Sequence, residues 1–168
     1  MDAIGPIEPA ASNDHRFILV AIDYFTKWVE VTSHKSVTKI THQNSTAYRL
    51  QMNGAIEAAN KNIKRILRKM TYNHKGWHEQ LPCALLGYRT MARTSTGATP
   101  YLLVYGTEAV IPVEVEIPSL RIIQEAELDN VKWVRARYEQ LALIDEKRIV
   151  VVYHSQLYQQ RMARAFNK

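Results

Sequence analysis

The segment Asn53–Met70 constrains the fold more than any other stretch of this 168-residue chain. Its apolar residues recur every three or four positions, which is the spacing of one face of an α-helix. These apolar residues are Ile56, Ala59, Ile63, Ile66, Leu67 and Met70. No proline interrupts the segment, and Asn53 is a candidate N-cap. We therefore predict a helix over residues 53–70 whose apolar face packs on a core.

The polar side of this helix is strongly basic. The chain holds 22 Lys and Arg against 16 Asp and Glu, a net charge of +6, and much of this excess lies in the helix. Its one acid is Glu57, and its basic residues are Lys61, Lys64, Arg65, Arg68 and Lys69. Such clustering predicts an anionic partner such as nucleic acid. The alternative is an ordinary solvated face stabilised by Glu–Lys pairs four residues apart.

Before this helix, the sequence favours β-structure. Residues 17–25 and 28–32 are rich in β-branched and aromatic side chains, which predicts a β-hairpin over about 16–33. Met1–Ile7 fits a short strand that enters a turn at Gly5-Pro6. Ile40–Asn44 is a further strand candidate. Asp23 is an acid in an apolar strand, so it needs partners or a function; we favour a carboxylate that accepts hydrogen bonds from turn amides.

After the central helix, the sequence favours helices. Residues 77–89 form an amphipathic pattern that predicts a short helix, with Pro82 expected in an early turn. A second short helix should begin at Pro100 and end at Gly106. Residues 110–119 are expected to be extended and to form a boundary. Residues 120–166 keep helical spacing, including the apolar run at 149–153, and predict a helical arm.

Some classes of protein are excluded by composition. Cys83 is the only cysteine, so the chain has no intrachain disulfide and no zinc site that needs two thiolates. We expect Cys83 to be a buried, small apolar residue. No apolar stretch is long enough to span a bilayer, and we expect an intracellular protein.

Several motifs in a fixed order resemble one family. They are Met1–Pro6, Asp23–Trp28, His42–Ser45, Asn53–Asn60 and Gly97–Gly106. Together they resemble the integrase catalytic core of gypsy-type long-terminal-repeat retrotransposons of plants. The resemblance implies an α/β, ribonuclease H-like fold with a mixed sheet flanked by helices. It also implies metal-dependent polynucleotidyl transfer in the nucleus, by multimers acting on DNA.

The resemblance also implies the site residues. Two aspartates and one glutamate would hold Mg²⁺ or Mn²⁺, and the first aspartate and the glutamate fall on Asp2 and Glu57 as catalytic and metal-binding residues. Lys61 and Lys64 fall on DNA-contacting positions. Asp23 falls on the family's second strand and is not one of the catalytic three.

One internal segment of the family is missing after Lys39. It would carry a crossover helix, a central strand and the second catalytic aspartate in a Thr-Asp-Asn-like turn. This chain has no acid between Glu30 and Glu57. We therefore expect an incomplete sheet that retains the hairpin, and impaired metal binding.

The expected organisation is a truncated catalytic core over residues 1–118 and a helical arm over 119–168, leading toward an absent C-terminal domain. The expected function is that of a retrotransposon integrase core fragment that binds nucleic acid and is catalytically inactive. Two alternatives stay open. One is a self-associating helical interaction module using residues 120–166, a homo-oligomer. The other is an active transferase, if the gap after Lys39 is a gene-model error.

Overall fold

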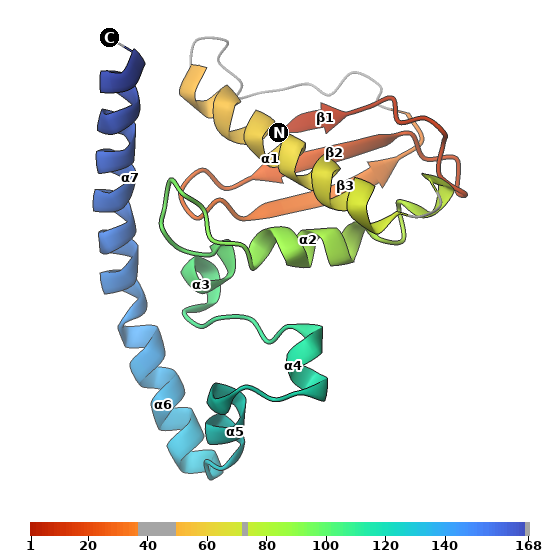
Figure 1. Ribbon diagram of the computed structural model, residues 1–168. Coiled ribbons are helices and arrows are strands. Elements are labelled where there is room, and N and C mark those ends of the chain that lie inside the picture. The colour runs from red at the N-terminus through yellow and green to blue at the C-terminus, as the bar shows by residue number, and fades with distance from the viewer. Residues whose placement is uncertain (37–49, 72–73, 167–168) are drawn as a thin grey trace. The chain divides into compact units, whose positions relative to one another are not determined.

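The computed structural model describes residues 1–36, 50–71 and 74–166 (Figure 1). The chain forms two compact units, residues 1–89 and 90–168. The division at residue 118, predicted to separate a catalytic core from a helical arm, stays a prediction. Ile40–Asn44 and the His42–Ser45 motif lie outside the described residues. Within the described ranges, no helix combines the length and the hydropathy needed to cross a membrane.

The first unit contains a three-stranded antiparallel sheet in the order β1-β2-β3. The strands are β1 (Asp2–Ile4), β2 (Phe17–Ile22) and β3 (Val29–His34). Asp2 lies opposite Val20, and Phe17 lies opposite His34. The predicted hairpin and N-terminal strand are thus confirmed, and the unit is α/β. The three described strands are not mixed in direction, because neither connection between them contains the crossover that a parallel pair requires.

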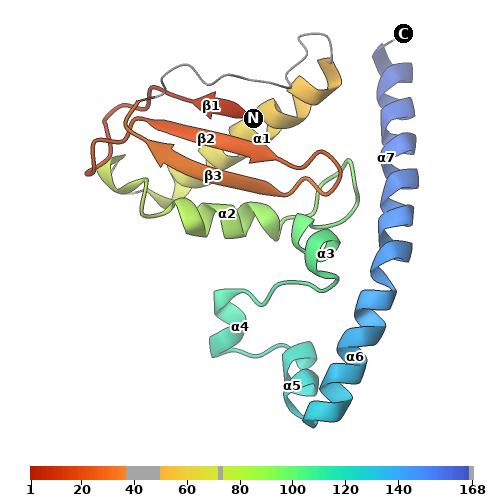
Figure 2. The same cartoon turned by 180° about the vertical axis from the view of Figure 1, so that it is seen from behind.

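Helix α1 (Leu50–Met70) lies across one face of this sheet, and Figure 2 shows the strands in front of it. Its apolar side is buried as predicted as far as Leu67: Ala59, Ile63 and Leu67 are at most 6% exposed, whereas Met70, at the end of the helix, is 39% exposed. The buried residues pack with strand residues such as Ile18, and burying each large apolar side chain contributes about 1.5–3 kcal/mol. The helix begins at Leu50, so Asn53 is not its N-cap. Leu50–Met52 are good helix formers that extend it by nearly a turn.

Helix α2 (Leu81–Arg89) completes the core of this unit and contacts α1 and β3. It begins four residues later than predicted, after a 3₁₀ turn η1 at His74–Gly76. The reason is Pro82, whose ring would clash with a carbonyl four residues earlier if the helix began at Trp77. Cys83 is exposed rather than buried, because the buried positions of α2 follow a helical stripe that excludes it.

Arg89 attaches the end of α2 to β3. Its guanidinium donates to the Val29 carbonyl from Nε at 3.1 Å and from Nη2 at 2.8 Å. It also lies 2.7 Å from Glu30 Oε2 and stacks over the Trp28 ring at 3.9 Å. One arginine thus links the last helix of the unit to the edge strand β3.

The second unit is helical, as predicted for most of its length. It contains α3 (Pro100–Tyr105), α4 (Pro112–Glu116), α5 (Leu120–Ala126), α6 (Asn130–Ala142) and α7 (Ile144–Phe166). Helix α3 begins with Thr99 as N-cap and ends at Gly106, which adopts φ 77°. The apolar run 149–153 is helical within α7, as expected.

The prediction of an extended segment over 110–119 is wrong. Pro112 occupies the first turn of α4, where its missing N–H costs little, and Glu114 Oε2 accepts a hydrogen bond from Ile111 N at 3.0 Å. Alternating valines and nearby prolines suggested a strand, but these local hydrogen bonds form a short helix instead.

Candidate functional site

Asp2 and Asn60 join the first strand to α1. Asn60 Nδ2 donates to Asp2 Oδ2 at 2.6 Å, and the backbone N–H of Ala3 donates to Asp2 Oδ1 at 2.8 Å. Asn60 is 8% exposed, so the amide is held in place by its surroundings. Hydrogen bonds to an ionised carboxylate are shorter and stronger than neutral ones. Both oxygens of Asp2 therefore have a donor.

Glu57 lies one helical turn before Asn60 and is exposed. Residues three apart on a helix are neighbours, with Cβ atoms about 5–6 Å apart. The structure thus brings Asp2 next to the turn of α1 that carries Glu57, although no direct contact joins the two carboxylates. Asn60 was not predicted as a site residue. The sequence carries no signal of this contact, because its partner Asp2 lies 58 residues away along the chain.

The residues around Asp2 and Glu57 do not fit a two-metal centre. Such a site is held by several carboxylates, and within the described residues no cluster of three or more Asp, Glu, His or Cys side chains is present. The implied Mg²⁺ or Mn²⁺ therefore lacks a sufficient donor set here.

Asp23 has a structural role in the turn between β2 and β3. Its Oδ2 accepts hydrogen bonds from Thr26 N at 2.8 Å and Thr26 Oγ1 at 2.5 Å. Burial alone would raise the pKa of Asp23, but these hydrogen bonds and nearby Lys27 outweigh it and lower the pKa. The pKa of Lys27 is lowered by burial, and the negative charge of Asp23, which would raise it, only partly offsets this effect. The preferred interpretation of Asp23, a carboxylate bonded to turn amides, is confirmed.

The five predicted DNA-binding residues are all exposed on α1. They are Lys61, Lys64, Arg65, Arg68 and Lys69. With about 100° between successive helical residues, they span a stripe about 140° wide. None of them forms an ion pair with another residue in the described part of the chain. This basic stripe is therefore open to an anionic partner.

Two viral polyproteins are similar to this chain. The Pro-Pol polyprotein of Simian foamy virus type 1 is 24% identical over 181 residues, covering 83% of this chain and 16% of the viral protein. That of Simian foamy virus type 3 (strain LK3) is 24% identical over 177 residues, covering 81% and 15%. This chain thus spans about one sixth of the length of these relatives, and no protein-family profile matches it. The similarities indicate a distant retroviral or retrotransposon-like relationship.

Proposed function

We propose that this chain is a fragment of a retrotransposon integrase core that binds DNA through the basic stripe of α1 and does not catalyse strand transfer. The first unit then corresponds to part of a ribonuclease H-like fold of the gypsy type. The distant similarity to the Pro-Pol polyproteins supports this origin. The exposed, unpaired cations of α1 support the binding activity, because phosphate contacts supply most nonspecific affinity for DNA.

The hydrogen bond between Asn60 and Asp2 is the observation that carries this proposal. It places the carboxylate at the start of β1 beside the turn of α1 that bears Glu57. A helix with one acid and five cations is common on protein surfaces. The charge pattern of α1 does not by itself imply that Asp2, from the distant strand β1, lies beside this helix. We propose that Asp2 and Glu57 occupy the positions of the first catalytic aspartate and the catalytic glutamate of the integrase core.

The lengths of the alignments support a missing internal segment. Coverage of 83% of 168 residues is about 139 residues, yet the alignment runs over 181 positions, so the relative has about 42 positions that this chain lacks. The second alignment gives about 41, from 81% of 168 residues and 177 positions. We propose that this gap follows Lys39 and contained the second catalytic aspartate. Without that ligand, no metal-dependent step is assigned to this chain.

The test is a pair of measurements on the full chain. Fluorescence anisotropy with a labelled duplex should show binding that weakens with salt. A strand-transfer assay with Mn²⁺ should show no joined product. Joined product that disappears in the Glu57→Gln variant would overturn the inactive assignment and favour an active transferase. A folded chain with no affinity for DNA would overturn the binding function.

A second candidate function, self-association through the helical arm, is favoured by its exposed apolar side chains. Val131, Tyr138, Val150, Tyr153 and Phe166 are each more than 60% exposed on α6 or α7. Val131 and Tyr138, seven residues apart, lie on the same side of α6, and an exposed apolar helix face of this kind marks an interaction surface. Sedimentation should show a dimer or larger species that dissociates when residues 120–166 are deleted. A monomer unaffected by the deletion would remove this candidate.

A further inference from the structure

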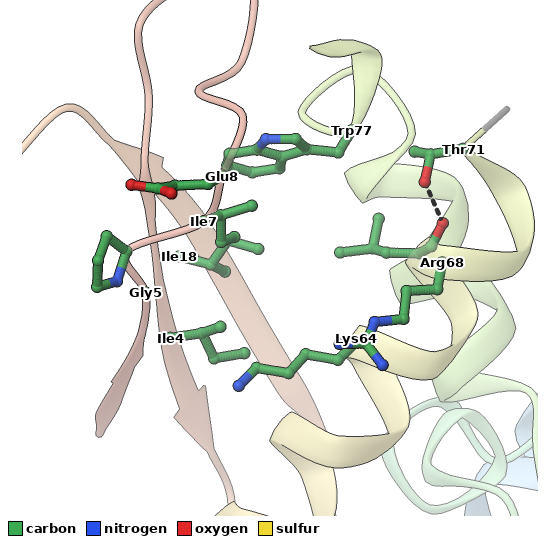
Figure 3. A pocket seen from close by; sticks show the side chains of 11 residues that line it. Ile4, Gly5, Ile7, Glu8, Ile18, Lys64, Arg68, Thr71 and Trp77 are labelled. Atoms are coloured by element: carbon green, nitrogen blue, oxygen red, sulfur yellow. Dashed lines mark hydrogen bonds between the residues drawn. The ribbon is translucent and has the colours of Figure 1, made fainter. Parts of the chain in front are cut away.

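A cleft of about 610 Å³ opens in the first unit, beside the carboxyl-terminal half of α1 (Figure 3). One wall comes from β1, β2 and the loop after β1, and the other from α1 and the turn that follows it. This volume lies within the range of small-molecule sites, about 300–1,000 Å³. The described residues of the cleft include five large apolar side chains, Ile4, Ile7, Ile18, Leu67 and Trp77.

The apolar walls of the cleft are fixed by the core. Ile4, Ile18, Leu67 and Trp77 are each at most 6% exposed and belong to the hydrophobic core of the unit. Thr71 Oγ1 donates to the Leu67 carbonyl at 2.7 Å and closes the end of α1 beside the cleft. Because these side chains are held by packing, an apolar ligand would meet a surface that is already formed.

The charged residues that line the cleft give it a positive rim. Lys64 and Arg68 are one turn apart on α1, and both extend along the same side of the opening (Figure 3). The Glu8 carboxylate, also on the rim, points away from the open centre. Neither cation has an ion-pair partner among the described residues. An anionic group at this side would therefore meet two cations, with Glu8, the acid of the cleft lining, turned away from it.

We infer that this cleft is a binding site for an organic monoanion, a carboxylate carried on an aromatic or branched aliphatic body. The body lies against Ile7 and the accessible edges of Leu67 and Trp77, above the buried Ile4 and Ile18, and the carboxylate lies against Lys64 and Arg68. A guanidinium beside an ammonium suits the planar carboxylate, because Arg binds it through two parallel N–H donors. A nucleotide base fits less well, since its polar edges would lie against mostly apolar walls. This site goes beyond DNA binding: it overlaps the basic stripe in Lys64 and Arg68 and differs from it in its apolar walls.

The test measures binding of 1-naphthoate to the full chain by calorimetry, with 1-naphthalenemethanol as the neutral analogue. Naphthoate should bind more tightly than the alcohol. The Lys64→Met/Arg68→Met double variant should weaken naphthoate binding by about fivefold or more, since each exposed ion pair contributes modestly, and should leave the alcohol unchanged. The matched control is Lys61→Met/Lys69→Met, which removes the same charge from the same helix outside the cleft. It should change naphthoate binding less than twofold.

Four outcomes would overturn the site. The first two are no naphthoate binding by the folded chain, and an equal loss of naphthoate affinity in the two double variants. The other two are alcohol binding as tight as naphthoate binding, and displacement of naphthoate by an equimolar amount of deoxyadenosine monophosphate. Urea unfolding of each variant checks that the fold is kept. Both double variants should weaken DNA binding alike, because each removes two cations of the basic stripe. Failure of the DNA-binding proposal would leave DNA affinity unchanged in both variants, whereas failure of the cleft proposal would affect only naphthoate binding.

Discussion

Neutralising part of the basic stripe should change how DNA binding depends on salt. The informative variant is Lys61→Gln/Arg65→Gln/Lys69→Gln. These three side chains are exposed, adjacent on one side of α1, and absent from the lining of the cleft. Their loss leaves Lys64 and Arg68 as the remaining cations of the stripe. Because exposed polar substitutions on a helix surface disturb packing little, stability should stay within about 0.5 kcal/mol.

The expected magnitude follows from counting phosphate contacts. If all five cations contact phosphates of duplex DNA, log K falls with log salt with a slope of about −4.5, and the variant retains a slope of about −1.8. Between 50 and 200 mM salt, affinity should then fall about 500-fold for the natural chain and about 12-fold for the variant. The slope reports the number of contacts and is therefore a sharper quantity than one dissociation constant.

Anisotropy titrations of a labelled duplex at four or more salt concentrations measure both slopes. The matched control is Lys132→Gln/Arg135→Gln/Arg161→Gln, which removes three exposed cations from the second unit and changes the net charge equally, from +6 to +3. It should keep the steep slope. The assignment of the α1 stripe as the DNA-binding surface would be refuted by an α1 variant that keeps the steep salt dependence of log K. It would also be refuted by a control variant whose salt dependence falls as much as that of the α1 variant.

Three further predictions concern stability. In a double-mutant cycle with Asp2→Asn and Asn60→Ala, urea unfolding should give a coupling energy of about 1 kcal/mol for their charge-assisted hydrogen bond, and additive effects would contradict it. The lowered pKa of Asp23 means that its carboxylate stabilises the fold above its ordinary value of 3.8, and that this stabilisation is lost as pH falls through the lower, folded-state pKa. Unfolding measured from pH 6 to pH 2 should therefore show a smaller acid-induced loss for Asp23→Asn, and a profile identical to the natural chain would be evidence against it. Gly106→Ala should destabilise the fold by about 1–2 kcal/mol, because Gly106 adopts φ 77°, which is unfavourable for alanine. Gly87→Ala should stabilise it by about 0.5–1 kcal/mol, because Gly87 lies within helix α2 and has open space for a methyl group. Thermal melts that rank the two variants the other way would contradict this.

Much of the first unit could be predicted from local pattern. Alternating and β-branched residues located β2 and β3, and the three- and four-residue spacing located α1, because each pattern matches the geometry of the element it forms. Boundaries were less accurate. The start of α2 depends on a clash at Pro82, and α4 depends on the hydrogen bond between Glu114 and Ile111. Neither effect appears in hydrophobic periodicity.

The candidate site was predicted only in part, and by resemblance. Periodicity placed Glu57 on the polar side of α1, but nothing in the spacing of residues could bring Asp2 to it. That proximity depends on how β1 pairs with β2 and how α1 lies on the sheet. Asn60 was missed because an amide in a helical pattern carries no sign of its partner. Its role became visible only with the 2.6 Å contact to Asp2.

The Asp2–Asn60 hydrogen bond also fixes how β1 lies on α1. An amide N–H from Asn60 and the N–H of Ala3 each donate to one oxygen of Asp2, and Glu57 is exposed to solvent that screens its charge. These hydrogen bonds hold the Asp2 carboxylate in place and leave lone pairs on both of its oxygens. Among the described residues, no group of three ligand side chains completes a metal site around it. DNA affinity that depends on monovalent salt through the basic stripe, and not on divalent metal at Asp2, is the behaviour that this geometry favours.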